Sequence, residues 1–295
     1  MKRKAIVLFL IGISCLVSAC TCFAVTTDYR MITWNMQGAS SNTQSKWSAV
    51  IPHMLSPQGD NAVVLALQES GSLPSRTTPA PQAEAPDRHG EGADAIEEVV
   101  WNIGTRTREN NVYIYHLQTG DRVNLALVSR VRAEEILVFP FPLPDLRPIF
   151  GIRIGDDYFF NIHAGAYQRN QAPEQVNEVH RYMANSNPLP AGLVPPRANA
   201  NWIIMGDFNR TPCIGEHALA PLLNQIMGVE FQIINTRRTT HTGATPRELD
   251  YGIIGRRIPP PPAPPFGTGP AFLSVATLTQ HLSDHFGVRF APPPP

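Results

Sequence analysis

The chain has 295 residues, a hydrophobic fraction of 43%, and 24 acidic against 24 basic residues. Strand-like segments continue along it without a domain-sized divider, so we expect one two-layer domain with a sizeable core. The zero net charge excludes a uniformly basic surface, and any binding to nucleic acid therefore has to come from a local patch.

The N-terminus has the pattern of a targeting segment. Residues 2–4 are basic, residues 5–17 are apolar, and small residues lead to a cleavage point at Ala24. The apolar run is too short to favour a membrane-spanning helix. An alternative is a lipoprotein-type site, with Cys20 lipidated. We expect an exported chain that passes through the periplasm, with a signal peptide at 1–24, one domain at 25–290 and a Pro-rich tail at 291–295.

Three of the four cysteines lie in the segment expected to be removed. Only Cys213 would remain, so the mature chain holds no internal disulfide. Cys213 is interpreted either as a small, partly buried hydrophobe or as a thiol that pairs with another chain.

The first strand is predicted at 28–35 and ends in Asn35. A loop and a short helix follow at 40–55, with Trp47 in the core. A second strand at 61–67 delivers Glu69. Residues 73–92 are rich in Pro and charge and lack periodicity, which predicts a mobile surface loop.

A series of strands is expected next, at 98–103, 112–117, 123–129, 135–139, 149–154 and 158–163. A helix entered through Pro173 continues to Asn185, and its His180 is interpreted as a packing residue. The loop 188–200 leads to a buried strand at 202–205 that Gly206 ends. A second helix at 215–227, interrupted by Pro221, a strand at 229–234 and an extended Pro-rich loop at 259–265 complete the prediction.

Polar, metal-competent side chains recur where the predicted strands begin or end. Asp207 and Asn209 stand two residues apart, a spacing that points both side chains to one face of an extended chain. The others are Asn35, Glu69, His163, Asp250, Asp284 and His285. We interpret the set as one site along one edge of a sheet sandwich; the alternative is a series of independent turns and caps.

In order, these motifs resemble the endonuclease/exonuclease/phosphatase superfamily, of which deoxyribonuclease I is a member. The segments 34–38, 68–74, 111–115, 122–129 and 151–155 are similar to its toxin branch, the cytolethal distending toxin B subunits. The resemblance extends from about residue 29 to 290. It implies an α/β fold, a two-layer β-sandwich flanked by helices.

Hydrolysis of a phosphodiester needs an activated water, relief of negative charge and protonation of the leaving oxygen. A hard cation with oxygen ligands suits this chemistry, and Mg²⁺ is expected, with Mn²⁺ or Ca²⁺ as alternatives. Glu69 is the first candidate ligand, supported by Asn35 and Asp284. The motifs lack cysteine and the histidines are not closely spaced, so structural zinc is not expected.

The resemblance also implies roles for the acid and base groups. His285 resembles the family's base, with Asp250 fixing its tautomer. Asp207 and Asn209 would orient the water and a phosphate oxygen, and His163 would face the phosphate from the opposite side.

Arginines supply candidate contacts to DNA phosphates. Arg108, Arg122 and Arg147 resemble positions that face the DNA backbone in the toxin branch, and the alternative for each is a surface salt bridge. One departure concerns the Glu that deoxyribonuclease I pairs with the histidine matching His163. By alignment Asn110 takes that place, which predicts a less well oriented imidazole.

Together these features predict a secreted, metal-dependent endonuclease, the active component of a toxin of this type. Such a component would need delivery chains for cell entry and would damage DNA in the host nucleus. An alternative is a phosphoinositide phosphatase that uses the same site. Another, of a different class, is a catalytically silent binding module.

Overall fold

The computed structural model describes residues 29–38, 42–56, 62–120, 123–139, 147–166, 170–213, 215, 218–243, 245–257, 273–278 and 283–291. The predicted signal segment at 1–24, Arg122, the Pro-rich loop at 259–265 and residues 292–295 lie outside this part of the chain. Ala291, which we assigned to the tail, is the last residue of a strand.

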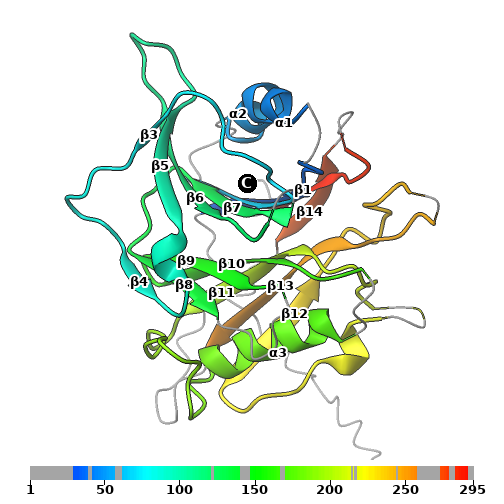
Figure 1. The fold of residues 1–295 in the computed structure, drawn as a ribbon. Helices are drawn as coiled ribbons and strands as arrows, with labels where there is room; N and C mark the ends of the chain where they lie inside the picture. The colour runs from blue at the N-terminus through cyan, green and yellow to red at the C-terminus, as the bar shows by residue number, and fades with distance from the viewer. Residues whose placement is uncertain are drawn as a thin grey trace, which may run out of the picture.

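Within the described residues, two mixed β-sheets stack face to face (Figure 1). β1 and β2 run parallel near the centre of the first sheet. In spatial order that sheet contains β14 (Ser274–Leu278), β15 (Gly287–Ala291), β1 (Tyr29–Asn35), β2 (Ala62–Gln68), β7 (Leu125–Ser129), β6 (Asn111–Leu117), β5 (Glu97–Asn102) and β3 (Thr77–Pro79).

The second sheet is built in the same way, with β10 and β11 parallel at its centre. In spatial order it contains β12 (Val229–Ile234), β13 (Asp250–Arg257), β11 (Asn201–Asp207), β10 (Asp157–His163), β9 (Ile149–Ile154), β8 (Glu135–Phe139) and β4 (Asp87–His89). Each sheet therefore places the carboxyl ends of a parallel pair side by side.

Helices cover the outer faces of the two sheets (Figure 1). On the first sheet, α1 (Thr43–Ser45) continues through a π-helical turn, η1 (Lys46–Val50), into α2 (Ile51–Met54). On the second sheet lies α3 (Gln171–Met183), with Pro173 in its first turn as predicted. Single 3₁₀ turns occur at η2 (Ala93–Ala95) and η4 (Ala220–Leu222).

The apolar side chains form three layers that follow from alternation along the strands. The layer between the sheets contains Met31, Val64, Phe159 and Met205. Two outer layers lie under the helices, one around Trp47 and the other around α3. The predicted two-layer sandwich flanked by helices is confirmed, and Trp47 is fully buried as expected.

Three local predictions were wrong. The stretch 73–92 contains β3 and β4, and Arg88 ties it down by donating to the carbonyls of Ala93 and Ile96. The predicted helix at 215–227 forms only η4 among its described residues, because Pro221 and Gly228 leave too short a run.

Gly206 also does not end its strand. It lies inside β11, and a Cβ there would meet the carbonyl oxygen of Ile162 on β10. Among the described residues, no helix is both long and apolar enough to cross a membrane.

His180 packs on α3 between two aromatic rings, as predicted for a core residue. Its ring centroid lies 5.1 Å from that of Trp202 and 4.1 Å from that of Phe231. Burial lowers the pKa of His180 from 6.5 to about 3. Below pH 6.5 the unfolded chain therefore takes up a proton at this position that the folded chain refuses until about pH 3.

We accordingly predict that the free energy of unfolding depends less on pH in His180→Phe than in wild type at acidic pH. As pH falls from 6.5 towards 4, wild type should lose about 1.4 kcal/mol of unfolding free energy per pH unit relative to the variant. Urea denaturation at a series of pH values measures this difference. The exposed control His53→Gln should follow wild type. Parallel profiles for wild type and His180→Phe would contradict the prediction.

Candidate active site

The strand register brings the predicted residues to one edge of the sandwich. His163 is the registered neighbour of Asp207, and Asp207 is the registered neighbour of Asp250. On the first sheet Asn35 pairs with Gln68, directly before Glu69. Because the carboxyl ends of parallel strands share an edge, these side chains converge there.

Strand alternation also sets the direction of the side chains. Asn35 follows Met31 at an interval of four residues, and Asp207 follows Met205 at an interval of two, so both share the face that packs between the sheets. His163 stands in the same relation to Phe159. The site is thus the open end of the inter-sheet core, where apolar residues give way to polar ones.

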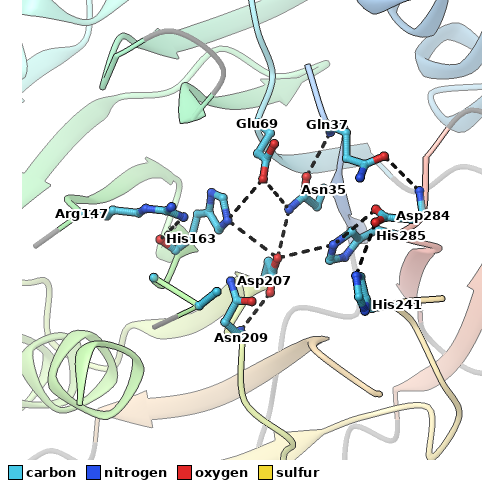
Figure 2. Close-up of a pocket in the computed structure, with 12 residues that line it drawn as sticks. Asn35, Gln37, Glu69, Arg147, His163, Asp207, Asn209, His241, Asp284 and His285 are labelled. Atoms are coloured by element: carbon cyan, nitrogen blue, oxygen red, sulfur yellow. Dashed lines mark hydrogen bonds and ion pairs between the residues drawn. The ribbon is translucent and has the colours of Figure 1, made fainter. Parts of the chain in front are cut away.

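Asp207 lies at the centre of this cluster (Figure 2). Its Oδ2 accepts a hydrogen bond from Asn35 Nδ2 at 3.0 Å and lies 3.7 Å from His163 Nε2 and 3.8 Å from His285 Nε2. Its Oδ1 accepts from the backbone N–H of Asn209 at 2.9 Å. Burial, together with the nearby Asp250, raises the pKa of Asp207 to about 6. Two imidazoles therefore face one carboxylate from opposite sides.

His285 is oriented by Asp250. Its Nδ1 lies 2.8 Å from Asp250 Oδ2, which places a proton on Nδ1 and turns Nε2 towards the cavity. Burial opposes a charged ring, but Asp250, Asp207 and Asp284 outweigh it and raise the pKa of His285 to about 9. The pairing of Asp250 with His285 is the arrangement that the family resemblance implied.

Three site residues adopt left-handed backbone conformations that non-glycine residues rarely take. The φ angles are 48° at Gln37, 48° at Glu69 and 49° at Asn209. Each residue follows the end of a strand, and the turn aims its side chain back at the cavity. Such conformations are typical of functional sites, where surrounding contacts hold them in place.

The side chains enclose a cavity of about 430 Å³. It brings together eight residues predicted for the site, namely Asn35, Glu69, Arg147, His163, Asp207, Asn209, Asp284 and His285. Asp250 lies directly behind His285.

Arg147 stands at the rim, with its Nη1 3.4 Å from the carbonyl oxygens of both His163 and Ala164. Asn209 is fixed by a 2.7 Å hydrogen bond from its Nδ2 to Ala164 O.

Three residues of the site were missed by the motif analysis. Gln37 links both halves: its N–H donates to Asn35 Oδ1 at 3.0 Å, and its Oε1 accepts from the N–H of Asp284 at 3.1 Å. Lys46 is buried beneath it and donates to the carbonyls of Met36 and Gln37. His241 lines the cavity beside Asp284. Gln37 lies within the segment 34–38 that resembles the toxin branch, whereas no sequence pattern indicated Lys46 or His241.

The donor set fits a hard divalent cation. Glu69, Asp207 and Asp284 all face the cavity with carboxylate oxygens, the ligand type that Mg²⁺ prefers. Asn35 donates its amide N–H to Glu69 Oε1 at 3.4 Å and to Asp207. Its Oδ1 accepts one hydrogen bond from the N–H of Gln37, so Asn35 both orients the carboxylates and keeps a second lone pair on Oδ1. Asp284 lies on the His285 side of the cavity, 3.7 Å from His285 Nε2.

Two predicted residues, Arg108 and Asn110, lie at the opposite end of the first sheet. Leu67, at the site end of β2, pairs with Ala126 of β7, which in turn pairs with His116 of β6. Val64, farther from the site, pairs with Ser129 of β7, which in turn pairs with Tyr113 of β6. The turn 103–110 precedes β6 and therefore lies at the far edge, roughly 20 Å away along the strands. Arg108 in this turn does not reach the cavity.

Asn110 belongs to the same distant turn. Its Oδ1 accepts a hydrogen bond from Arg130, which also donates to Leu55 O. Asn110 therefore does not occupy the place of a residue that orients His163, and the alignment that put it there was wrong. Of the two interpretations of Cys213, the partly buried hydrophobe is wrong, since the structure exposes this residue.

Comparison with known proteins agrees with this geometry. Residues 32–285 match the model of the Endonuclease/Exonuclease/phosphatase family. The chain is 38% identical to the cytolethal distending toxin B subunit of Escherichia coli over 270 residues, covering 89% of this chain and 91% of that protein.

Solved structures give the same result. The structure of CdtB, described as the biologically active subunit of cytolethal distending toxin, has a TM-score of 0.69 at 35% identity, covering 90% of this chain and 98% of the other. The Haemophilus ducreyi cytolethal distending toxin contains a chain with a TM-score of 0.69 at 32% identity and the same coverage.

The position of Asn110 gives a testable expectation. Asn110→Glu should leave the rate of plasmid nicking unchanged, because the new carboxylate meets Arg130 at the far edge and not His163. Agarose gels of nicked and supercoiled plasmid measure the rate. Faster nicking by the variant would show that this turn does act on the site.

Proposed function

Because this chain belongs to the endonuclease/exonuclease/phosphatase family, and within it to the cytolethal distending toxin B subunits, we propose that it is a toxin catalytic subunit that cleaves DNA phosphodiester bonds. The observation that carries the proposal is the placement of His163 and His285 on opposite sides of Asp207. Two titratable rings on either side of one carboxylate suit proton removal from water on one side and proton delivery to a leaving oxygen on the other.

The chain's own residues supply most of this chemistry. Asp207 accepts a hydrogen bond from water and holds it near the phosphorus, while the N–H of Asn209 fixes the carboxylate. His285 takes the proton from water at Nε2 once that atom is free, and Asp250 stabilises the resulting imidazolium. His163 faces the phosphate from the other side. The division of acid and base roles between the two histidines follows the family resemblance.

The family implies a divalent cation, and we propose Mg²⁺ with Glu69 as its main protein ligand. Asn35 holds the Glu69 carboxylate in place, and Asp284 offers a further oxygen across the cavity. When bound, the cation supplies charge neutralisation at the phosphate and polarises its oxygen.

Arg147 is proposed as the contact to a DNA phosphate at the cavity rim. Its guanidinium is half-buried beside His163, which suits a backbone contact that positions the duplex without reading its sequence. Arg122, which lies outside the described residues, and Arg108, which is exposed in the turn before β6, keep this role as proposals.

The experiment that tests the function measures two reactions in parallel. Purified protein is incubated with supercoiled plasmid in Mg²⁺ or EDTA, and phosphate release from phosphoinositides is measured beside it. Nicking that requires Mg²⁺ supports the proposal. Phosphate release without nicking would favour the phosphatase alternative, and neither reaction would favour a silent binding module.

The position of His285 predicts a specific loss. His285→Ala should reduce nicking by about 10²- to 10⁴-fold, because it removes the group that accepts the proton from water. Asp250→Asn should cause a smaller loss, since it disturbs the tautomer and leaves the ring in place. Circular dichroism checks that both variants are folded. A folded His285→Ala variant that nicks at the wild-type rate would refute the assignment.

We also propose that residues 1–24 direct secretion, that 25–290 form the catalytic domain, and that delivery subunits carry it towards host DNA. Mass spectrometry of the exported chain tests the first point: a mature N-terminus at residue 25 supports it. A lipid on Cys20 would contradict it. Pull-down with candidate delivery chains from the producing cell tests the assembly.

Cys213 is proposed as a link to one of these chains. It is exposed beside a groove of about 650 Å³ that also presents Arg237, Arg238 and Arg247. A disulfide at this position would form outside the cell and break in a reducing cytosol. Non-reducing electrophoresis of the co-expressed complex should show an adduct that disappears in Cys213→Ser. An adduct that persists in that variant would exclude this cysteine.

A further inference from the structure

His241 lies on the cavity wall but plays no part in the hydrolysis described above. It belongs to the loop between β12 and β13, and its ring stands next to Asp284 and His285 (Figure 2). The backbone fixes this placement. The N–H of Thr242 donates to Asp284 O at 2.9 Å, and the N–H of Phe286 donates to Thr240 O at 2.7 Å.

His241 and His285 are therefore joined by an isolated antiparallel bridge that lies outside the strands of the two sheets. Their ring centroids lie 4.7 Å apart. Their separation along the chain hid this pair from the sequence analysis, which found no close histidine spacing.

The distances suit a small metal ion. His241 Nε2 lies 3.4 Å from Asp284 Oδ2, and His285 Nε2 lies 3.7 Å from Asp284 Oδ1. One ligand atom from each of the three residues lies within 4.8 Å of the other two. A tetrahedral Zn²⁺ with bonds of about 2.0–2.1 Å separates its ligands by about 3.3 Å.

The surroundings of the ligands match those of metal-binding histidines. Asp250 accepts from His285 Nδ1–H, so Nε2 is the atom that binds a metal once its proton is displaced, as in carboxylate–histidine–metal arrangements. Gln37 holds the backbone of Asp284 from the other side. Two imidazoles and one carboxylate favour a transition metal of the zinc class, whereas Mg²⁺ prefers oxygen ligands.

Gly243 provides the space for the His241 ring. A Cβ at this residue would lie against His241 Cε1 and 2.9 Å from its Nε2. The φ angle of Gly243 is not among the left-handed ones, so its backbone does not require glycine. The absence of a side chain at Gly243 leaves the space that the His241 ring occupies.

We propose that His241, Asp284 and His285 bind a divalent transition-metal ion beside the Glu69 site, with which they share Asp284, and that this ion inhibits hydrolysis. Coordination occupies the Nε2 lone pair of His285, which then does not accept a proton from water. The inhibitory part rests on the proposed function, whereas the binding part does not.

Calorimetric titration with ZnCl₂ tests the binding part. The Cys213→Ser background removes the exposed thiol, which is an unrelated zinc ligand. In this background we expect one site whose Kd rises by at least about tenfold in His241→Gln, since even residues behind a ligand contribute that much. Gly243→Ala should also weaken binding by displacing the ring. His53→Gln and Glu69→Gln should bind like the parent.

Nicking at fixed Mg²⁺ with increasing Zn²⁺ tests the inhibitory part. Zn²⁺ should slow the parent and leave His241→Gln close to its own rate without zinc. Absence of zinc binding, or equal binding by parent and His241→Gln, would overturn the site. Bound zinc that leaves nicking unchanged would overturn the inhibition. A parent inactive in Mg²⁺ alone would refute the proposed function, while calorimetry still decides the metal site.

Discussion

The structure depends on Asp207, a buried carboxylate at the point where the two sheets meet. Asp207 accepts a hydrogen bond from Asn35 of the first sheet and lies beside His163 of the second sheet. It also faces His285, which belongs to the segment before β15. A buried charge is costly unless it is hydrogen-bonded and paired, so each of these contacts offsets part of that cost. The site is consequently assembled by the fold around one charge, and the loss of one partner disturbs the others.

The layer beneath the site keeps the sheets in register. Gln68 donates to Asn161 Oδ1 at 2.7 Å, and Asn161 Nδ2 donates to the carbonyls of Leu67 and Ala126 at 2.9 Å each. These hydrogen bonds join β2 to β10 across an otherwise apolar interface. A buried polar network whose members are satisfied rigidifies its surroundings. It also fixes the positions along the chain at which Glu69 and His163, which follow Gln68 and Asn161, face each other.

The sequence predicted most of this site because its residues directly follow or precede apolar runs. Buried strands give strong signals, and Asn35, His163 and Asp207 stand where those signals stop. His241 was not predicted because its position depends on the pairing of its loop with the segment around His285, through the hydrogen bond from Phe286 N–H to Thr240 O. No local sequence pattern encodes this pairing. Asn110 was misplaced for a related reason, since a motif match does not say at which end of a strand a turn lies. β4 formed through tertiary pairing with β8, against its composition.

The central claim is that Asp207 links both histidines in one hydrolytic site. Its most direct test is the plasmid-nicking rate of Asp207→Asn in Mg²⁺, compared with Asp157→Asn at the opposite end of β10. The amide replaces a carboxylate oxygen that Asn35 and both imidazoles face, so the rate should fall by at least about 10²-fold. Asp157→Asn should keep the wild-type rate. A folded Asp207→Asn protein that nicks as fast as wild type would contradict the account.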